Sequence, residues 1–345
     1  MEYMTKKPLV GMTLDDLRLV VKSLGMPRFT AGQIAEWIYQ KKVGDIEMMT
    51  NISKKNRALL SRDYEVGVFA PSHGMRSVDG TVKYLFGHDS NEAVETVFIP
   101  DRERATLCVS SQVGCKMHCA FCMTGKQGFT KSLSACEILN QMISVPDGDK
   151  LTNVVFMGMG EPLDNFDNLK KVLEVMTSDW GFGWSPKRIT VSTVGVRRGL
   201  LRFLDESDCH LAVSLHCPVP EQREGLMPAE RAYSITDMVE DLKKYDFSHQ
   251  RRLSFEYIVF KDMNDGPEYA RILVNLLKGL DCRVNLIRYH AIPGDDFEGV
   301  DDEHMIKFRD YLTNHGCFAT IRASRGEDIF AACGMLSTLE KEKIN

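Results

Sequence analysis

The spacing of apolar residues changes twice along the chain, and this predicts three parts. From about residue 13 to residue 64, apolar residues recur every three or four positions, which is the period of a helix. Thr13 is a favourable cap for the first helix, and Gly25 is a favourable end for it. Two further short helices are expected over 34–38 and 53–60. Residues 1–65 should therefore form a small helical domain, which is too short to bury much surface by itself.

The next part, residues 66–100, has the alternation of apolar and polar positions that is typical of strands. The clearest runs cover 84–86 and 94–99, and Asp79-Gly80 predicts a tight turn before them. We expect a short β-rich connector here.

The remainder, residues 101–345, alternates strand-like runs with amphipathic helices. Ser134 and Glu137 have the spacing of a capping box, and apolar periodicity predicts further helices around 169–176 and 235–242. The strand-like runs cover residues 107–111, 153–157, 188–193, 210–215, 253–259, 284–287 and 318–321. Strands that alternate with helices form βαβ units and a parallel sheet, so the fold class is α/β with a partial or full (β/α) barrel.

Polar residues and glycines gather where these strands end. They occur at 158–161, at Ser192, at 214–216 and at 289–290. The active sites of α/β barrels are built at the carboxyl ends of the strands, so these segments should surround one mouth. A cysteine-rich loop follows the first strand on the same side.

That loop contains Cys115, Cys119 and Cys122, three thiols within eight residues. A cubane iron–sulfur cluster normally takes four thiolates, so three leave one iron with an open position where a small molecule can bind and react. The alternative is a structural zinc site completed by His118 or by a distant cysteine. A zinc ribbon would need a second paired cysteine motif, which the sequence lacks, and this favours the cluster.

A second candidate segment is Gly158-Met159-Gly160-Glu161-Pro162, which follows a buried strand. Its glycines would let the backbone approach a ligand closely, and Glu161 could accept a hydrogen bond from a cationic amine. Tight turns after strands also use glycine, so this segment alone does not identify a ligand.

Composition and net charge indicate the cellular compartment but do not identify the substrate. The chain has 345 residues, ten cysteines and a net charge of −5, and it shows neither a long apolar run nor a signal-peptide core. We therefore expect a cytoplasmic protein with reduced thiols and no membrane association. An acidic chain is not typical of nucleic-acid binders, so an RNA partner would need local basic patches such as that of Lys54, Lys55 and Arg57, although most such patches are solvated faces.

The cysteine spacing and the Gly-Met-Gly-Glu-Pro segment together resemble the radical S-adenosylmethionine (SAM) superfamily. The stretches at 107–115, at 214–216 and at 331–334 (Ala-Ala-Cys-Gly) further resemble the RlmN/Cfr family of RNA adenine methyltransferases. The resemblance extends through nearly the whole chain. It implies a radical SAM core over residues 101–345 with a C-terminal catalytic loop, and an RNA-binding role for the helical domain.

The resemblance also implies a reaction. Cys115, Cys119 and Cys122 would hold one [4Fe–4S] cluster, and two SAM molecules would be used per turnover. One SAM would methylate Cys333, and the other would give the 5′-deoxyadenosyl radical that activates this methyl group for addition to an adenine. Cys108 would then form a disulfide with Cys333 to release the product, and Glu95 matches the family's proton acceptor. Without the resemblance, lone cysteines are often packing residues.

The family's SAM contacts carry over to several positions near the strand ends. At one of them the family has asparagine where this chain has His290, which can still form a hydrogen bond. The positions are Gly160, Glu161, Ser192, Ser214, Leu215, His216 and His290.

The implied partners are 23S ribosomal RNA and transfer RNA, a flavodoxin- or ferredoxin-type electron donor, and a thioredoxin-like reductant for the disulfide. We expect a monomer. Trp180 and Trp184 would either stack on a base or pack in the interior.

Two alternatives to this reaction remain open. The stretch Gln127-Gly128-Phe129 resembles the branch that methylates adenine C2, whereas the Cfr branch methylates C8 and confers antibiotic resistance. From another class, a zinc-stabilised RNA-binding protein without catalysis would hold zinc and no iron.

Overall fold

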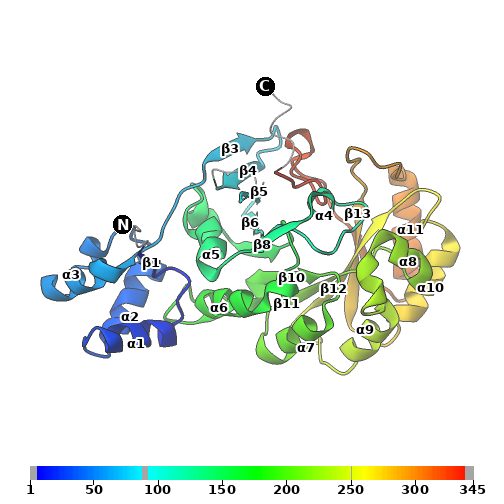
Figure 1. The fold of residues 1–345 in the computed structure, drawn as a ribbon. Helices are drawn as coiled ribbons and strands as arrows, with labels where there is room; N and C mark the ends of the chain where they lie inside the picture. The colour runs from blue at the N-terminus through cyan, green and yellow to red at the C-terminus, as the bar shows by residue number, and fades with distance from the viewer. Residues whose placement is uncertain (1–5, 88–91, 250, 339–345) are drawn as a thin grey trace. The chain divides into compact units, whose positions relative to one another are not determined.

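The computed structural model (Figure 1) describes residues 6–87, 92–249 and 251–338, which form two compact units. Unit 1 comprises Met1–Pro71, Leu133–Lys150 and Asp167–Ser185. Unit 2 comprises Ser72–Ser132, Leu151–Phe166 and Pro186–Asn345.

Unit 2 is built on one mixed sheet, which has ten strands among the described residues. The strands are β3 (His73–Arg76), β4 (Val82–Phe86), β5 (Val94–Asp101), β6 (Arg104–Cys108), β9 (Asn153–Phe156), β10 (Ile189–Thr193), β11 (His210–Ser214), β12 (Leu253–Val259), β13 (Cys282–Arg288) and β14 (Ala319–Ile321). Their order is β14-β13-β12-β11-β10-β9-β6-β5-β4-β3. All pairs from β6 to β14 are parallel, and those from β3 to β6 are antiparallel.

The parallel part of this sheet confirms the predicted α/β class. Each of the seven strand-like runs from 107–111 onward corresponds to one strand, β6 or β9 to β14. The sheet ends at β14 on one side and at β3 on the other, so within the described ranges the barrel is partial. The connector strands β3 to β5 extend the same sheet, because β5 pairs with β6 through a tight turn at 101–104.

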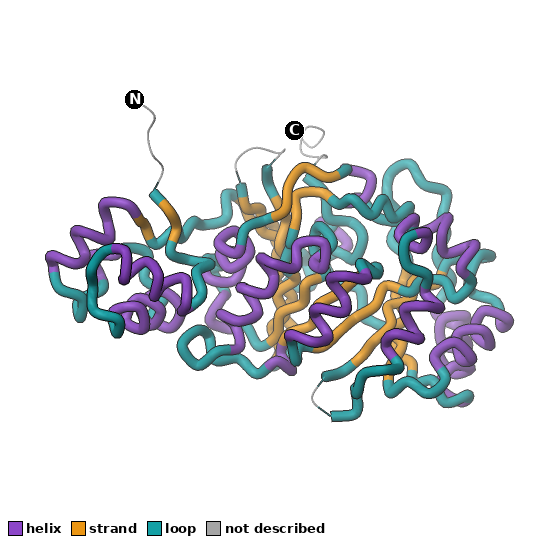
Figure 2. The backbone as a smooth tube through the Cα atoms, turned by 60° about the horizontal axis from the view of Figure 1, so that its bottom comes forward, coloured by secondary structure: helices purple, strands orange, loops and turns teal. Residues whose placement is uncertain are grey.

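Helices, which are purple in Figure 2, and short turns connect the strands of unit 2. The helices are α4 (Met123–Gln127), α7 (Arg197–Glu206), α8 (Pro220–Leu226), α9 (Ile235–Leu242), α10 (Pro267–Leu277) and α11 (Asp302–Asn314). The 3₁₀ turns are Pro162–Asn165, Pro186–Arg188, Pro228–Arg231 and Glu327–Ile329. A separate hairpin of β7 (Gln112–Gly114) and β8 (Phe129–Ser132) encloses the cysteine loop.

Unit 1 is mostly helical. Its elements are β1 (Lys7–Pro8), α1 (Leu14–Ser23), α2 (Thr30–Ala35), a π-helix (Glu36–Gln40), a 3₁₀ turn (Ile46–Met48), α3 (Lys54–Asp63), β2 (Tyr64–Glu65), α5 (Ala135–Ile143), a 3₁₀ turn (Gly148–Lys150) and α6 (Phe166–Thr177) without its first residue. The predicted caps are confirmed, because Thr13 and Ser134 both form capping boxes.

Polar contacts join the distant segments of unit 1. The Asn140 side chain donates to the Gly67 carbonyl at 2.8 Å and accepts from the Phe69 amide at 2.9 Å. Lys171 pairs with Asp16 at 2.8 Å. Residues far apart in sequence therefore share one interior.

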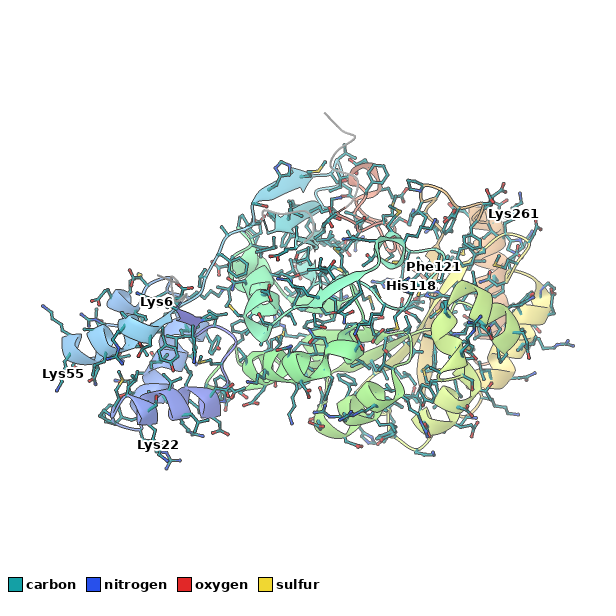
Figure 3. All side chains as sticks on the ribbon, viewed as in Figure 1. Lys6, Lys22, Lys55, His118, Phe121 and Lys261 are labelled. Atoms are coloured by element: carbon teal, nitrogen blue, oxygen red, sulfur yellow. The ribbon has the colours of Figure 1, made fainter. Side chains whose placement is uncertain are left out.

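The aromatic and basic residues of unit 1 have different environments. Trp180 packs edge-on against the buried Tyr39, with ring centroids 5.9 Å apart. Arg57 is buried and donates to the Ile52 carbonyl at 2.8 Å, so it stabilises a turn and is not a free cation. Lys55 and Lys22 project outward from α3 and α1 (Figure 3). Over the described ranges, no helix is both long and apolar enough to cross a bilayer.

Candidate active site

A cavity of about 150 Å³ lies in unit 2 at the carboxyl ends of the parallel strands. The predicted residues that line it are Cys115, Cys119, Cys122, Gly160, Glu161, Ser192, Ser214, His216 and Cys333. The structure thus brings together residues that span more than 200 positions of the sequence.

The cysteine loop is shaped by the β7–β8 hairpin and by residues in left-handed conformations. Gly114 has φ +71°, and a Cβ there would overlap the carbonyl oxygen of Gly128. His118 also has a positive φ, 50°, and its Nδ1 lies 3.3 Å from the Gly125 oxygen, so the structure gives it a place in the turn. The Cys122 residue immediately precedes α4.

The three loop thiols are close enough to affect one another's ionisation. Burial, followed by smaller contributions from the neighbouring thiols and acidic groups, raises the pKa of Cys115 to about 12 and that of Cys119 well above its usual value. Burial also raises the pKa of Cys122. The thiols are therefore neutral at pH 7, and metal binding would have to displace their protons.

The donor set fits a cluster with an open iron. In the described part of the chain, no three His, Cys, Asp or Glu side chains are gathered around the position of one metal ion. A cubane does not require such convergence, because each thiolate binds a different iron atom. The three thiols face one cavity, and that cavity extends beyond them.

Phe121 covers one wall beside the cysteines and is 7% exposed. Its ring lies edge-on to His216, with centroids 4.8 Å apart, and 5.8 Å from Phe260. An aromatic wall at this place would shield a cluster bound to the cysteines from water.

Glu161 is held by two backbone amides. Its Oε1 accepts from Leu163 at 3.0 Å and its Oε2 from Val194 at 2.9 Å. Burial outweighs these hydrogen bonds and raises its pKa to about 7. Gly160 has φ +94°, and a Cβ there would collide with Gln112, so this glycine is required for packing as well as for the turn.

His216 is a neutral hydrogen-bonding group. Burial first, and then the positive charge of Arg223, lower its pKa to about 3. Its Nδ1 accepts from the Ile258 amide at 3.0 Å, so we assign the proton to Nε2, which becomes a donor.

Two predicted SAM contacts lie apart from the cavity lining. Leu215 is fully buried, and its amide donates to the Glu256 carbonyl at 3.0 Å. His290 is within 3.1 Å of the Ser324 hydroxyl and 3.7 Å of Glu327. Neither is among the residues that line the cavity, and their contact with SAM stays a prediction.

Cys108 and Cys333 share a smaller extension of the cavity, of about 80 Å³. Burial first, and then the Cys333 thiol, raise the pKa of Cys108 to about 12. Cys333 is exposed, and all ten cysteines, which lie within the described residues, are free thiols. Arg322 lines this space and pairs with Glu256 at 3.1 Å.

Glu95 is almost fully buried on β5 and is not a free carboxylate. It pairs with Lys83 Nζ at 3.1 Å, and it accepts from the Ser337 amide at 3.1 Å. Ser337 follows Cys333 by four residues, so Glu95 contacts the segment that carries this cysteine.

Sequence reasoning did not identify Glu256, Arg322 or Lys83. Glu256 interrupts the apolar run Phe255-Glu256-Tyr257 of a buried strand, and a charge at such a position was an available signal. Arg322 and Lys83 had no comparable signal, because only the fold shows which charge each one meets.

Comparison with known proteins agrees with this geometry. The model of the radical SAM superfamily matches residues 109–273, and that of the ribosomal RNA large subunit methyltransferase N-terminal domain matches residues 7–66. A probable dual-specificity RNA methyltransferase RlmN of Bacteroides fragilis is 66% identical over 342 residues. The match covers 99% of this chain and 99% of that protein. The chain belongs to the RlmN family.

Other relatives support the RlmN assignment over the full length. The dual-specificity RNA methyltransferase RlmN of Marinobacter nauticus is 41% identical over 341 residues, which cover 96% of this chain and 92% of that protein. The crystal structure of a radical SAM methyltransferase from Sphaerobacter thermophilus matches with a TM-score of 0.89 and 36% identity, covering 96% of this chain and 99% of that one. The protein is therefore a radical SAM RNA methyltransferase, and its family implies a [4Fe–4S] cluster and SAM.

Proposed function

We propose that this enzyme methylates C2 of adenine in two RNAs, adenosine 2503 of 23S ribosomal RNA and adenosine 37 of transfer RNAs. The observation that carries the proposal is the single cavity that the three loop cysteines share with Cys333, with Cys108 beside it. A methyltransferase that used SAM directly would need neither a cluster loop nor two further thiols. Adenine C2 has no lone pair to attack a sulfonium methyl group, so a radical route is required there.

Different residues of the cavity would bind the cluster and SAM. Cys115, Cys119 and Cys122 would hold the cluster, and Glu161, Ser192, Ser214 and His216 line the cavity in which SAM would bind. When bound, the cluster and SAM supply the electron and the carbon radical that the reaction needs. Glu161 accepts from the cationic amine of SAM, and the Nε2 proton of His216 is available as a donor.

Cys333 carries the methyl group to the base. Its thiolate takes a methyl group from one of the two SAM molecules used per turnover, which leaves as the neutral thioether. After the carbon has joined the adenine, the unpaired electron of the adduct would return to the cluster and the base would lose its C2 proton. The Cys108 thiolate then attacks the Cys333 sulfur, so that an S–S bond forms and the bond from sulfur to the product carbon breaks. That carbon keeps the electron pair and takes up a proton to become the methyl group. Glu95 serves as the proton acceptor in this sequence, from its position beside the Cys333 segment.

The proposed reaction requires two redox partners. A thioredoxin-like dithiol returns it to two thiols, and a flavodoxin- or ferredoxin-type donor supplies the electron. Ribosomal and transfer RNAs are the substrates, so the enzyme acts in the cytoplasm, as a monomer. Lys54 and Lys55, exposed on α3, are candidates for phosphate contacts.

The test is mass spectrometry of RNA after anaerobic incubation with the reconstituted enzyme, SAM and a reductant. We expect 2-methyladenosine at both positions and none with the Cys333→Ala variant. Cys108→Ala should leave protein covalently attached to RNA. The appearance of 8-methyladenosine instead would establish the C8 activity, and a colourless protein that holds zinc and no iron would overturn the enzymatic proposal.

A further inference from the structure

The segment that carries Cys333 has little regular structure of its own. Between β14 and residue 338 it forms one 3₁₀ turn, Glu327–Ile329, and Phe330 after this turn has a left-handed backbone with φ 52°. Such a conformation costs energy in a residue other than glycine and persists only where surrounding contacts stabilise it. The position of the Cys333 sulfur must therefore be set by contacts outside the segment.

The part after Cys333 is hydrogen-bonded to α4, the helix that follows the cysteine loop in the sequence. The Met123 amide donates to the Gly334 carbonyl at 2.8 Å, and the Thr124 hydroxyl donates to the Leu336 carbonyl at 2.7 Å. The Gln127 side chain donates to the Thr338 hydroxyl at 2.6 Å. This end is held by the site already described.

The part before Cys333 is attached to a different element, the turn between β3 and β4. Asp328 accepts from the Ser77 hydroxyl at 2.5 Å and from the Val78 amide at 3.1 Å. In return, Asp79 of the turn accepts from the Gly326 amide at 2.9 Å. Each partner thus supplies one carboxylate, and charge-assisted hydrogen bonds run in both directions.

The two sides of this contact also fit closely. Gly326 has φ +64°, and a Cβ there would lie 2.9 Å from the Ala331 side chain and 3.0 Å from that of Thr81. Thr81 is fully buried. The hydrogen bonds from Gly326, Thr81 and Ser77 outweigh burial and lower the pKa of Asp79 to about 2, so its carboxylate is ionised at pH 7.

We propose that Asp328 and Asp79 are positioning residues that lock the Cys333 segment onto the β3–β4 turn and so set the approach of Cys333 to Cys108. The proposal rests on the proposed function only for the roles of the two cysteines. Ala331 and Ala332, between the lock and Cys333, line the same small cavity as Cys108, so a shift of the segment changes the separation of the two sulfurs.

The first test measures the reduction potential of the Cys108–Cys333 disulfide in the cluster-loaded enzyme, titrated anaerobically with a dithiol/disulfide buffer. The two thiols lose two protons and two electrons to the buffer disulfide, which becomes a dithiol. Asp328→Ala should lower the equilibrium constant for disulfide formation about tenfold, which raises the potential by about 30 mV. Ser77→Ala should act in the same direction, and the double variant should not exceed the larger single effect.

The matched control is Asp101→Ala. Asp101 pairs with Arg325 of the same segment at 3.3 Å, but the Asp101 side chain is exposed and that of Arg325 is only half-buried. An exposed pair contributes little, so the potential should stay at the wild-type value.

A second measurement reports segment opening without the disulfide. In a Cys333→Ala background, Asp328→Ala should increase the rate at which iodoacetamide alkylates Cys108 roughly tenfold, because Ala331 and Ala332 no longer cover it. With RNA, the Asp328→Ala variant should lose kcat while the KM for RNA is unchanged.

If Asp328→Ala lowers the melting temperature but leaves both the disulfide potential and Cys108 alkylation unchanged, Asp328 has only a structural role and the proposal is overturned. Shifted potentials in an enzyme that methylates no RNA would support the lock and refute the proposed function. The two failures are therefore distinguishable.

Discussion

At the scale of single residues, burial decides which groups of the cavity carry charge. It raises the pKa of Glu161 to about 7 and lowers that of His216 to about 3. The sequence shows a carboxylate and an imidazole, but at neutral pH the histidine is uncharged and the glutamate is partly protonated. The cavity therefore has a different charge from the one its residue types suggest.

The raised pKa of Glu161 predicts that SAM binding depends on pH. In the proposed function, ionised Glu161 pairs with the SAM amine, so the SAM affinity measured by equilibrium dialysis should rise roughly tenfold from pH 6 to pH 8 as the carboxyl loses its proton. Because burial raises this pKa from 4.5 to about 7, the stability of the SAM-free protein should fall as the pH rises from about 4.5 to about 7 and should level off above that. Glu161→Gln should bind SAM more weakly and show no such step, whereas a flat wild-type profile would contradict the assignment.

At the scale of elements, the β7–β8 hairpin sets the path of the cysteine loop. Its strands close on Gly114, whose left-handed conformation lets the chain pass the Gly128 carbonyl. The sequence placed the cysteines correctly after the first parallel strand, but it gave no sign of the hairpin, since β7 and β8 are short and lack a clear alternation. The loop geometry is therefore a property of this pairing.

Replacing Gly114 by Ala tests the hairpin. The added Cβ would overlap the Gly128 oxygen, and the strands must separate, so we expect less than about half of the wild-type iron after anaerobic reconstitution. The matched control is Gly279→Ala, because Gly279 also has a positive φ, +89°, but no atom lies within 4 Å of its added Cβ. Iron analysis and visible absorption measure the outcome, and normal iron content in Gly114→Ala would show that the hairpin is not needed.

At the scale of the whole molecule, each compact unit is assembled from segments that are not consecutive in the sequence. The N-terminal helices form one unit with α5 and most of α6, which lie between strands of unit 2 in the sequence. Asn140 joins these parts through Gly67 and Phe69. Unit 1 is thus connected to unit 2 by the chain at several points, and we expect the N-terminal helices not to behave as a detachable domain.

Asn140→Ala tests this organisation. It removes a fully buried side chain together with its partly buried hydrogen bonds to the Gly67 carbonyl and the Phe69 amide, which should destabilise unit 1 by about 2 kcal/mol. Hydrogen exchange should accelerate over residues 7–71. Gln33→Ala, which removes an exposed hydrogen bond of 3.4 Å, is the control and should change the stability by less than about 0.5 kcal/mol. Equal protection of the backbone amides from hydrogen exchange in both variants would contradict the conclusion that these segments share one interior in unit 1.

The sequence by itself determined the succession of the parallel strands, the caps at Thr13 and Ser134, and the cysteine loop at the carboxyl end of the first parallel strand. These follow from local periodicity and spacing, which depend on neighbours a few residues away. Only the tertiary structure decided that the connector strands extend the barrel sheet, that Arg57 is buried, and that Glu95 pairs with Lys83. It alone showed the lock between Asp328 and the turn at 77–79, because such contacts join positions about 250 residues apart, whose distance no local pattern encodes.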